Sequence, residues 1–212
     1  MKMVASNASP EKKGSLSTLV SEAVGGVKVH GAEVEEIRLA DQDIRYCRFC
    51  MTCYRDPDSD IGRCSQDDDM RWILPALKAA DGYILATQVS SGHGNAIFKT
   101  FMERRVYTAG SPKGKFLWLK GIPVSRFTDR KRFAVTIATA GGVPSWMRVF
   151  CDTATRQMKE MADLSFNARV IGTLYAGEQT FKGLQDTDRR KARTLGEKLV
   201  VKIKDSGTSI NA

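Results

Sequence analysis

Short apolar segments alternate with segments of helical periodicity along nearly the whole chain, and this alternation restricts the folds open to it. Segments with the length and composition of strands lie at residues 2–5, 33–39, 82–87, 132–138 and 169–175. Apolar residues at helical spacing predict helices around residues 16–23, 70–77, 95–107, 144–161 and 186–204. Strands and helices in alternation predict an α/β fold, in which helices cover both faces of a parallel sheet.

The length of 212 residues fits one domain, which we expect at residues 1–205, with a flexible tail at 206–212. The first residues lack the apolar core of a signal peptide, and no stretch approaches about 18 consecutive apolar residues. We therefore expect a cytoplasmic protein without a membrane-spanning segment.

Four of the five cysteines lie within one polar loop, which we expect at residues 45–69 without regular structure. Cys47, Cys50 and Cys53 follow the spacing Cys-x2-Cys-x2-Cys, and ten residues separate Cys53 from Cys64. Three thiolates on a tight turn with a fourth nearby are suitable ligands for a [4Fe–4S] cluster. A zinc site more often includes histidine or two separated Cys-x2-Cys pairs, and a structural disulfide is disfavoured in the cytosol. Metal binding and thiol redox chemistry therefore both stay open.

The net charge of +9 is concentrated in one segment, because residues 99–132 contain ten lysines and arginines against two acidic residues, which leaves +8 there. Residues 108–131 of this segment are expected to form a long basic loop. The apolar stretch 116–119 indicates that the loop packs on something, such as a second subunit. The charge is typical of a solvated surface, or of a site for an anionic cofactor or an acidic redox partner. No motif for nucleic-acid recognition accompanies it.

The loop after the first expected strand runs from Ser9 to Ser17, directly into the first expected helix. Hydroxyl groups and a glycine at a helix N-terminus form an anion site, because backbone N–H groups and the helix dipole face the anion. The loop is not a Walker A motif, since Ser15 stands where a lysine would follow Gly14. It is equally consistent with an ordinary serine N-cap. The candidate phosphate-binding residues are Ser9, Lys13, Gly14, Ser15, Leu16 and Ser17.

Two further loops rich in small residues follow the third and fourth expected strands. In an open α/β sheet, ligands bind beyond the carboxyl ends of the strands, so three such loops at one edge favour a bound mononucleotide. Backbone without bulky side chains also lets a flat aromatic ring approach closely. The candidate ring-binding residues are Gln88, Val89, Ser90, Gly92, His93, Gly94 and Asn95 in one loop and Thr139, Ala140, Gly141 and Gly142 in the other.

Four segments together resemble the flavodoxin-like NAD(P)H-dependent FMN reductases, and within them the iron–sulfur flavoproteins. The segments are SPEKKGSLSTL, CRFCMTC with the later GRCSQDDDM, ADGYILATQVSSGHGNAIFKTFMER, and TIATAGG, in this order. The resemblance covers nearly the whole chain. Its specific part is the cysteine motif with the downstream Gly-x-Cys and Asp-Asp-Met, whereas the glycine loops occur more widely.

The resemblance implies a flavodoxin-like fold, a doubly wound five-stranded parallel sheet in the order 2-1-3-4-5 with FMN at the switch point. It implies that the three loops hold the phosphate and flank the flavin ring. It also implies a [4Fe–4S] cluster on Cys47, Cys50, Cys53 and Cys64, and assembly as a homodimer or homotetramer.

The chain departs from the family pattern in three places. Glu11 stands where the family has a basic residue, so Lys12 or Lys13 is expected to compensate for the phosphate charge. The stretch Gln-Val-Ser at 88–90 lacks the aromatic residue that the family commonly has there, which enlarges the expected substrate pocket. The gap between the third and fourth cysteines is longer than usual, and relatives with similar cysteines exist without a cluster, so a metal-free loop stays an alternative.

The expected function is that of an FMN-dependent oxidoreductase, which passes electrons from NAD(P)H or a reduced partner to a small-molecule or protein acceptor. We assign no catalytic residue, because hydride transfer to a flavin requires no acid–base group of the protein. One alternative is an electron carrier without a substrate of its own, which exchanges electrons with ferredoxin. A zinc-stapled nucleic-acid-binding protein is a further alternative, although it leaves the three small-residue loops unexplained.

Overall fold

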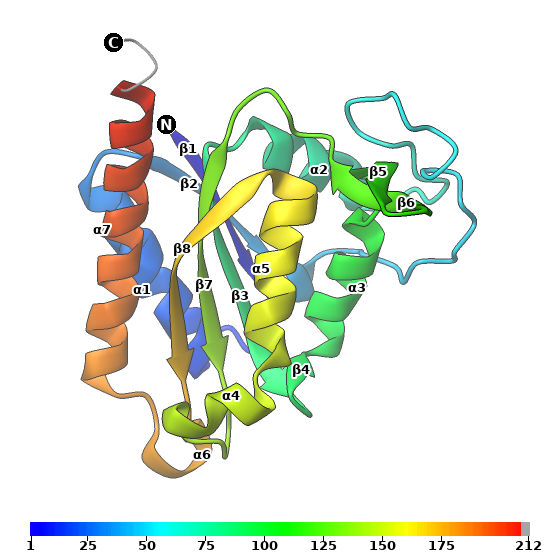
Figure 1. The fold of residues 1–212 in the computed structure, drawn as a ribbon. Helices are drawn as coiled ribbons and strands as arrows, with labels where there is room; N and C mark the ends of the chain where they lie inside the picture. The colour runs from blue at the N-terminus through cyan, green and yellow to red at the C-terminus, as the bar shows by residue number, and fades with distance from the viewer. Residues whose placement is uncertain (209–212) are drawn as a thin grey trace.

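A parallel sheet forms the centre of the fold in the computed structural model, which describes residues 1–208 (Figure 1). Its strands lie in the order β2–β1–β3–β7–β8, all parallel, which confirms the predicted flavodoxin-like order. Their bounds are β1 Lys2–Asn7, β2 Glu33–Arg38, β3 Gly82–Ser90, β7 Arg132–Thr139 and β8 Ala168–Ala176. The five expected strands are therefore all present, each within a few residues of its expected bounds.

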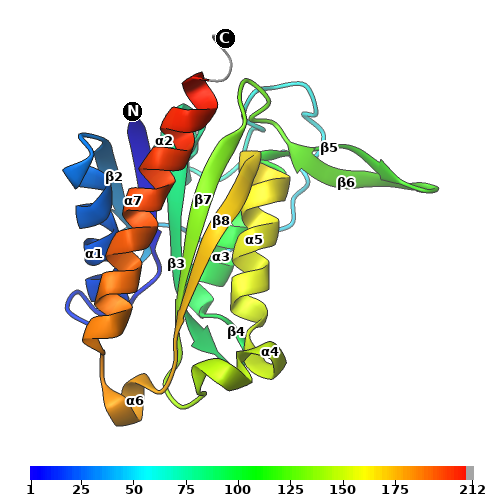
Figure 2. The same ribbon diagram turned by 60° about the vertical axis from the view of Figure 1, so that its left-hand side comes forward.

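Helices cover both faces of the sheet (Figures 1 and 2). On one face, α1 and α7 pack side by side, and their apolar residues form a core with β1, β3, β7 and β8. On the other face, α2, α3 and α5 form a second core with the same sheet. The bounds are α1 Ser15–Val29, α2 Met70–Ala79, α3 Ala96–Arg105, α5 Thr153–Phe166 and α7 Asp186–Thr208. Three shorter elements, α4 Arg148–Cys151, α6 Gln179–Lys182 and the 3-10 turn Ser145–Met147, lie at the carboxyl edge of the sheet, and a further 3-10 turn, Leu39–Asp41, follows β2.

Two glycines allow α1 and α7 to approach closely. A Cβ atom built on Gly196 would overlap the backbone carbonyl oxygen of Ala23. A Cβ atom built on Gly26 would overlap the carbonyl oxygen of Arg193 in the same way. The close packing of these two helices therefore depends on the absence of a side chain at both positions.

The segment expected to be a loop at 108–131 is instead a two-stranded antiparallel hairpin. Its strands are β5 Gly110–Phe116 and β6 Leu119–Ser125, and Figure 2 shows the hairpin projecting from the body of the molecule. The tight turn between them places Leu117 in the left-handed region, with φ of 54°. The apolar residues at the tip are exposed, with Trp118 at 81%.

The positive charge of the basic segment 99–132 lies only partly on the surface. Four of its arginines are buried: Arg104, Arg105, Arg126 and Arg132. Arg132 donates from Nε to the carbonyl oxygen of Ala80 at 2.9 Å. These cations fix the chain internally, so much of the segment's charge is unavailable to a docking partner.

The remaining differences concern the ends of elements. The helix expected at 144–161 is interrupted, and α5 begins only after Asp152, whose side chain accepts from the N–H of Thr155 at 2.8 Å. Helix α7 extends to Thr208, so it includes three residues assigned to the flexible tail, and 209–212 lie outside the described residues. None of the helices in the described part of the chain is long and apolar enough to cross a membrane.

Candidate functional site

A cleft of about 520 Å³ opens at the carboxyl edge of the sheet, where all three predicted loops meet. Its volume lies within the usual range for a small-molecule site. Eight of the predicted residues line it: Ser15, Gln88, Val89, Ser90, Asn95, Thr139, Ala140 and Gly141. Six residues that we did not predict also line it: Pro10, Glu11, Ala96, Ile97, Gln179 and Thr180. The nine other predicted residues lie in the same three loops but do not line the cleft: Ser9, Lys13, Gly14, Leu16, Ser17, Gly92, His93, Gly94 and Gly142.

The first loop, residues 9–17, is folded around its own hydroxyl groups. The Oγ atoms of Ser9 and Ser17 are buried and donate to the carbonyl oxygen of Glu11, at 2.9 and 2.6 Å. Gly14 precedes α1, and no side chain caps the N-terminus of this helix. The helix therefore presents uncapped N–H groups beside a cluster of hydroxyl groups, an arrangement suited to an anion.

The second loop is shorter than predicted, because β3 continues to Ser90. Val89 and Ser90 pair with the short antiparallel strand β4, His93–Gly94, across a turn in which Gly92 has a φ of 81°. Asn95 then caps α3 by accepting from the N–H of Phe98 at 3.0 Å. The Nδ2 atom of Asn95 donates to the carbonyl oxygen of Ala8 at 2.7 Å, which ties this loop to the end of β1.

The third loop is held by a helix that the sequence interpretation overlooked. The N–H groups of Gln179 and Thr180, at the start of α6, donate to the carbonyl oxygens of Ala140 and Gly141, both at 3.0 Å. The Oε1 atom of Gln179 is buried and has no hydrogen-bond partner among the described residues. A sequence signal was available, because α6 follows the fifth parallel strand and so had to lie at the same edge.

The cysteine loop lies against the carboxyl end of α3, where Arg104 contacts Arg45 and Cys64, and has no regular structure over 45–69, as predicted. Its four cysteines, Cys47, Cys50, Cys53 and Cys64, line one cavity of about 270 Å³. Arg104 and Tyr107, at the carboxyl end of α3, line the same cavity. Within residues 1–208, no group of three or more His, Cys, Asp or Glu side chains is close enough to hold a metal ion.

A buried ion pair anchors both ends of the cysteine loop. The side chains of Asp68 and Arg104 are 0% and 1% exposed, and Arg104 donates to both carboxylate oxygens. Arg104 also donates to the carbonyl oxygen of Arg45 at 2.7 Å and to Sγ of Cys64 at 3.3 Å. The Asp68 carboxylate therefore has a structural role, and the sulfur of Cys64 faces a fixed positive charge.

A second buried arginine holds the middle of the loop. Arg126, at the end of the hairpin, donates to the carbonyl oxygens of Cys53, Asp56 and Ser59 in the loop, at 3.2, 2.5 and 2.5 Å. Its Nε atom donates to the carbonyl oxygen of Gly110 at 2.8 Å. The hairpin and the cysteine loop thus share one guanidinium group.

The thiols differ in their surroundings. Cys50 lies 3.1 Å from Oγ of Ser65 and 3.4 Å from Oγ1 of Thr52, and these hydroxyl groups lower the pKa of its thiol to about 7. Burial raises the pKa of the Cys53 thiol, and the neighbouring cysteines raise it further. The cavity therefore contains one thiol that ionises easily and one that resists ionisation.

The residues fit two different groups. At the cleft, the uncapped helix, the clustered hydroxyl groups and the unpartnered Gln179 Oε1 suit a ligand with a phosphate at one end and N–H donors at the other. At the cysteine cavity, a single zinc ion would need four sulfurs within about 4 Å of one another, given its Zn–S bonds of about 2.3 Å and tetrahedral geometry. The donor set, four cysteines around one cavity, is that of an iron–sulfur cluster.

Comparisons with known proteins identify a matching family model and related sequences. A model of the family described as NADPH-dependent FMN reductase matches residues 1–142. An iron-sulfur flavoprotein of Methanocaldococcus jannaschii is 36% identical over 104 residues, which are 49% of this chain and 51% of that protein. In that comparison the chain spans about half of the relative's length. A second iron-sulfur flavoprotein of this organism is 26% identical over 205 residues, covering 94% of this chain and 93% of the relative.

Solved structures share the fold. A flavone reductase superposes with a TM-score of 0.71 at 19% identity, over 98% of this chain and 64% of that one. At this identity the likeness concerns the arrangement of the sheet and helices alone.

Proposed function

The chain belongs to the NADPH-dependent FMN reductase family, and on that premise we propose that it is an FMN-dependent oxidoreductase that takes electrons from NAD(P)H or a reduced partner and delivers them through a [4Fe–4S] cluster. One observation carries the proposal. The cleft with the anion-binding loop and the cavity with the four cysteines lie at opposite ends of a single helix, α3, whose residues line both.

The cleft would hold FMN with its phosphate at the first loop. Ser15 at the cleft, the buried hydroxyl groups of Ser9 and Ser17 behind it and the uncapped first N–H groups of α1 would donate to the phosphate. The backbone of 88–95 and of 139–142 would flank the flavin ring, with Gln179 at its edge. When bound, FMN supplies the capacity to accept a hydride from NAD(P)H and to release electrons singly or in pairs.

The protein's part in the chemistry is positional. Asn95 connects the ends of β1 and β3, because its Nδ2 atom donates to the carbonyl oxygen of Ala8 and its backbone N–H donates to the carbonyl oxygen of Gln88 at 3.1 Å. Turns made of small residues leave one face of the cleft open for the nicotinamide or an acceptor. No side chain in the cleft needs to move a proton for hydride transfer itself.

Cys47, Cys50, Cys53 and Cys64 would hold the cluster, which supplies single-electron steps when present. Arg126 and Arg104 fix the loop that carries these four sulfurs. We further propose a single FMN-binding domain at residues 1–205, a homodimer or homotetramer, and a cytoplasmic location. A ferredoxin stays an alternative acceptor, and turnover with quinone or free flavin, measured against turnover with ferredoxin, separates an enzyme from a carrier.

The decisive experiment is anaerobic purification followed by an absorption spectrum and counts of iron, sulfide and FMN. We expect one FMN and four irons per chain, and Cys64→Ser should lose iron while retaining FMN. A yellow protein without iron would reject the cluster and leave the flavin. A colourless protein that binds no added FMN would reject the function altogether.

A further inference from the structure

Donors from the first loop and from β2 converge on one carbonyl oxygen of the loop. The carbonyl oxygen of Glu11 accepts from Ser9 Oγ at 2.9 Å, from Ser17 Oγ at 2.6 Å and from Arg38 Nη1 at 3.3 Å. A carbonyl oxygen has only two lone pairs. Three donors therefore share one acceptor, and a ligand with several acceptor oxygens would give each donor an acceptor of its own.

Arg38, the last residue of β2, is the cation that reaches this cluster. Its Nη1 atom also donates to Ser17 Oγ at 3.3 Å, and its Nε atom donates to Asp41 at 3.0 Å. Its Nη2 atom is buried and has no hydrogen-bond partner among the described residues. A buried donor of a charged group without an acceptor is costly, which indicates that an acceptor is missing beside Arg38.

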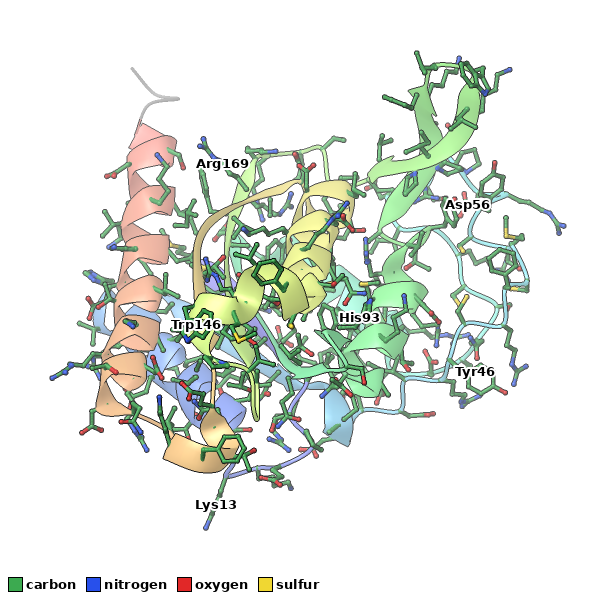
Figure 3. All side chains as sticks on the ribbon, turned by 60° about the horizontal axis from the view of Figure 1, so that its bottom comes forward. Lys13, Tyr46, Asp56, His93, Trp146 and Arg169 are labelled. Atoms are coloured by element: carbon green, nitrogen blue, oxygen red, sulfur yellow. The ribbon has the colours of Figure 1, made fainter. Side chains whose placement is uncertain are left out.

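The other charges near the loop do not supply what a phosphate needs. Lys12 lies 4.0 Å from Asp41, and Lys13 is exposed and points away from the body of the molecule (Figure 3). Glu11 adds a carboxylate, whose Oε2 lies 2.8 Å from the point that a Cβ on Gly14 would occupy. Of the cations in this neighbourhood, Arg38 is the one in contact with the hydroxyl groups.

We propose that Arg38 recognises the FMN phosphate and thereby makes this chain select FMN over riboflavin, an inference that rests on the flavin function proposed above. Phosphate oxygens would take over the donors that now converge on the Glu11 carbonyl, and Nη2 of Arg38 would gain its acceptor. The guanidinium group offers a planar fork of donors that a lysine ammonium lacks. A residue from the neighbouring strand thus replaces the basic residue that the loop itself lacks.

Dissociation constants of FMN and riboflavin for the full chain, from quenching of flavin fluorescence, test this. Arg38→Met should weaken FMN binding about 10- to 100-fold, the loss expected for a charge-assisted hydrogen bond, and leave riboflavin binding within about twofold. The FMN dissociation constant of Arg38→Lys should lie between those of the unmodified chain and of Arg38→Met, because lysine keeps the positive charge but lacks the planar fork of donors. Lys28→Met removes one positive charge from the far end of α1, where Lys28 pairs with Glu36 at 3.7 Å, and should change neither constant.

Four results would overturn the proposal. The first three are unchanged FMN binding by Arg38→Met, an equal loss of FMN and riboflavin binding in this variant, and an FMN-selective loss in Lys13→Met alone. The fourth is faster trypsin cleavage after Lys12 or Lys13 in both Arg38 variants, because this would show that Arg38 holds the loop in place. Failure of the unmodified chain to bind either flavin would reject the proposed function instead.

Discussion

Single residues hold the cysteine loop in place, and Asp68 is the clearest case. Burial would raise the pKa of its carboxyl group, but hydrogen bonds from Arg104 and from the N–H of Arg45 outweigh burial and hold this pKa below its usual range. The unfolded chain therefore binds a proton at Asp68 more readily than the folded chain does. The stability that this group contributes is complete above the unfolded pKa of about 4 and is lost as the pH falls through the lower folded pKa.

Asp68→Asn should lower the free energy of unfolding at pH 7 by about 3–5 kcal/mol, because it leaves the charge of Arg104 buried without its partner. Urea unfolding between pH 7 and pH 3 measures both this loss and a weaker acid dependence in the variant. Asp67→Asn is the control: the exposed Asp67 pairs with Arg71 at 2.9 Å on the surface, and its loss should cost less than about 1 kcal/mol. Equal effects of the two variants would contradict the structural role of Asp68.

The hydrogen bonds of Arg126 lead to a prediction about the local order of the cysteine loop. Arg126→Met removes the donors shared by Cys53, Asp56 and Ser59, so trypsin should cut after Arg55 and Arg63 at least about tenfold faster as the loop opens locally. Lys113→Met is matched to it, since Lys113 also links the hairpin to the loop, through Asp58 at 2.6 Å, but on the surface. Similar cleavage of both variants would show that the buried arginine does not hold the loop.

Some residues of the two sites could be predicted from the sequence and others could not, and the difference has a physical reason. Ser15, Gln88 and Thr139 could be predicted because each lies at or shortly after the carboxyl end of a strand, and strand ends are visible in the local pattern. Arg38, Arg104 and Arg126 could not, since their partners lie far along the chain and a charged residue by default indicates solvent. Long-range hydrogen bonds leave no local periodicity.

At the scale of elements, the central strands β1, β3 and β7 were predictable because both of their faces are buried and apolar residues dominate them, whereas the edge strands β2 and β8 are only partly buried. The β5–β6 hairpin was not, because its strands contain Gly and Pro and its turn, Leu117–Trp118, lacks the usual Asn-Gly or Asp-Gly signal. The break before α5 was also hidden, since the Asp152 cap lies inside an otherwise helical pattern.

The contact between α1 and α7 makes Gly196→Ala a sharp test of the packing. Alanine favours a helix over glycine by about 1 kcal/mol, yet its Cβ would overlap the Ala23 carbonyl, so we expect a net loss of at least about 2 kcal/mol. Gly207→Ala in the same helix has open space around its Cβ and should be neutral or stabilising. Urea unfolding of the two variants measures the difference, and a stable Gly196→Ala protein would mean that the helices sit farther apart.

At the scale of the whole molecule, the exposed apolar tip of the hairpin leads to a prediction about the assembly of the protein. Trp118 contacts no core, so Trp118→Ser should change the free energy of unfolding per chain by less than about 0.5 kcal/mol. If the tip forms a subunit contact, as its exposed apolar surface indicates, the same variant should shift the protein to a smaller species. Light scattering coupled to gel filtration distinguishes the species, with Lys120→Ser on the same hairpin as control. An unchanged assembly in Trp118→Ser would place the contact elsewhere.

Helix α3 also acts as a spacer. Its first residues, Ala96 and Ile97, line the cleft, and Glu103 and Arg104 near its end line the cysteine cavity. Ten residues at about 1.5 Å each make it about 15 Å long. Tunnelling between redox centres slows steeply with separation, so in the function proposed above the length of this one helix would limit the rate of electron transfer between the two sites of a single chain. A longer or shorter α3 would change this proposed transfer rate while leaving the residues proposed to bind each group in place.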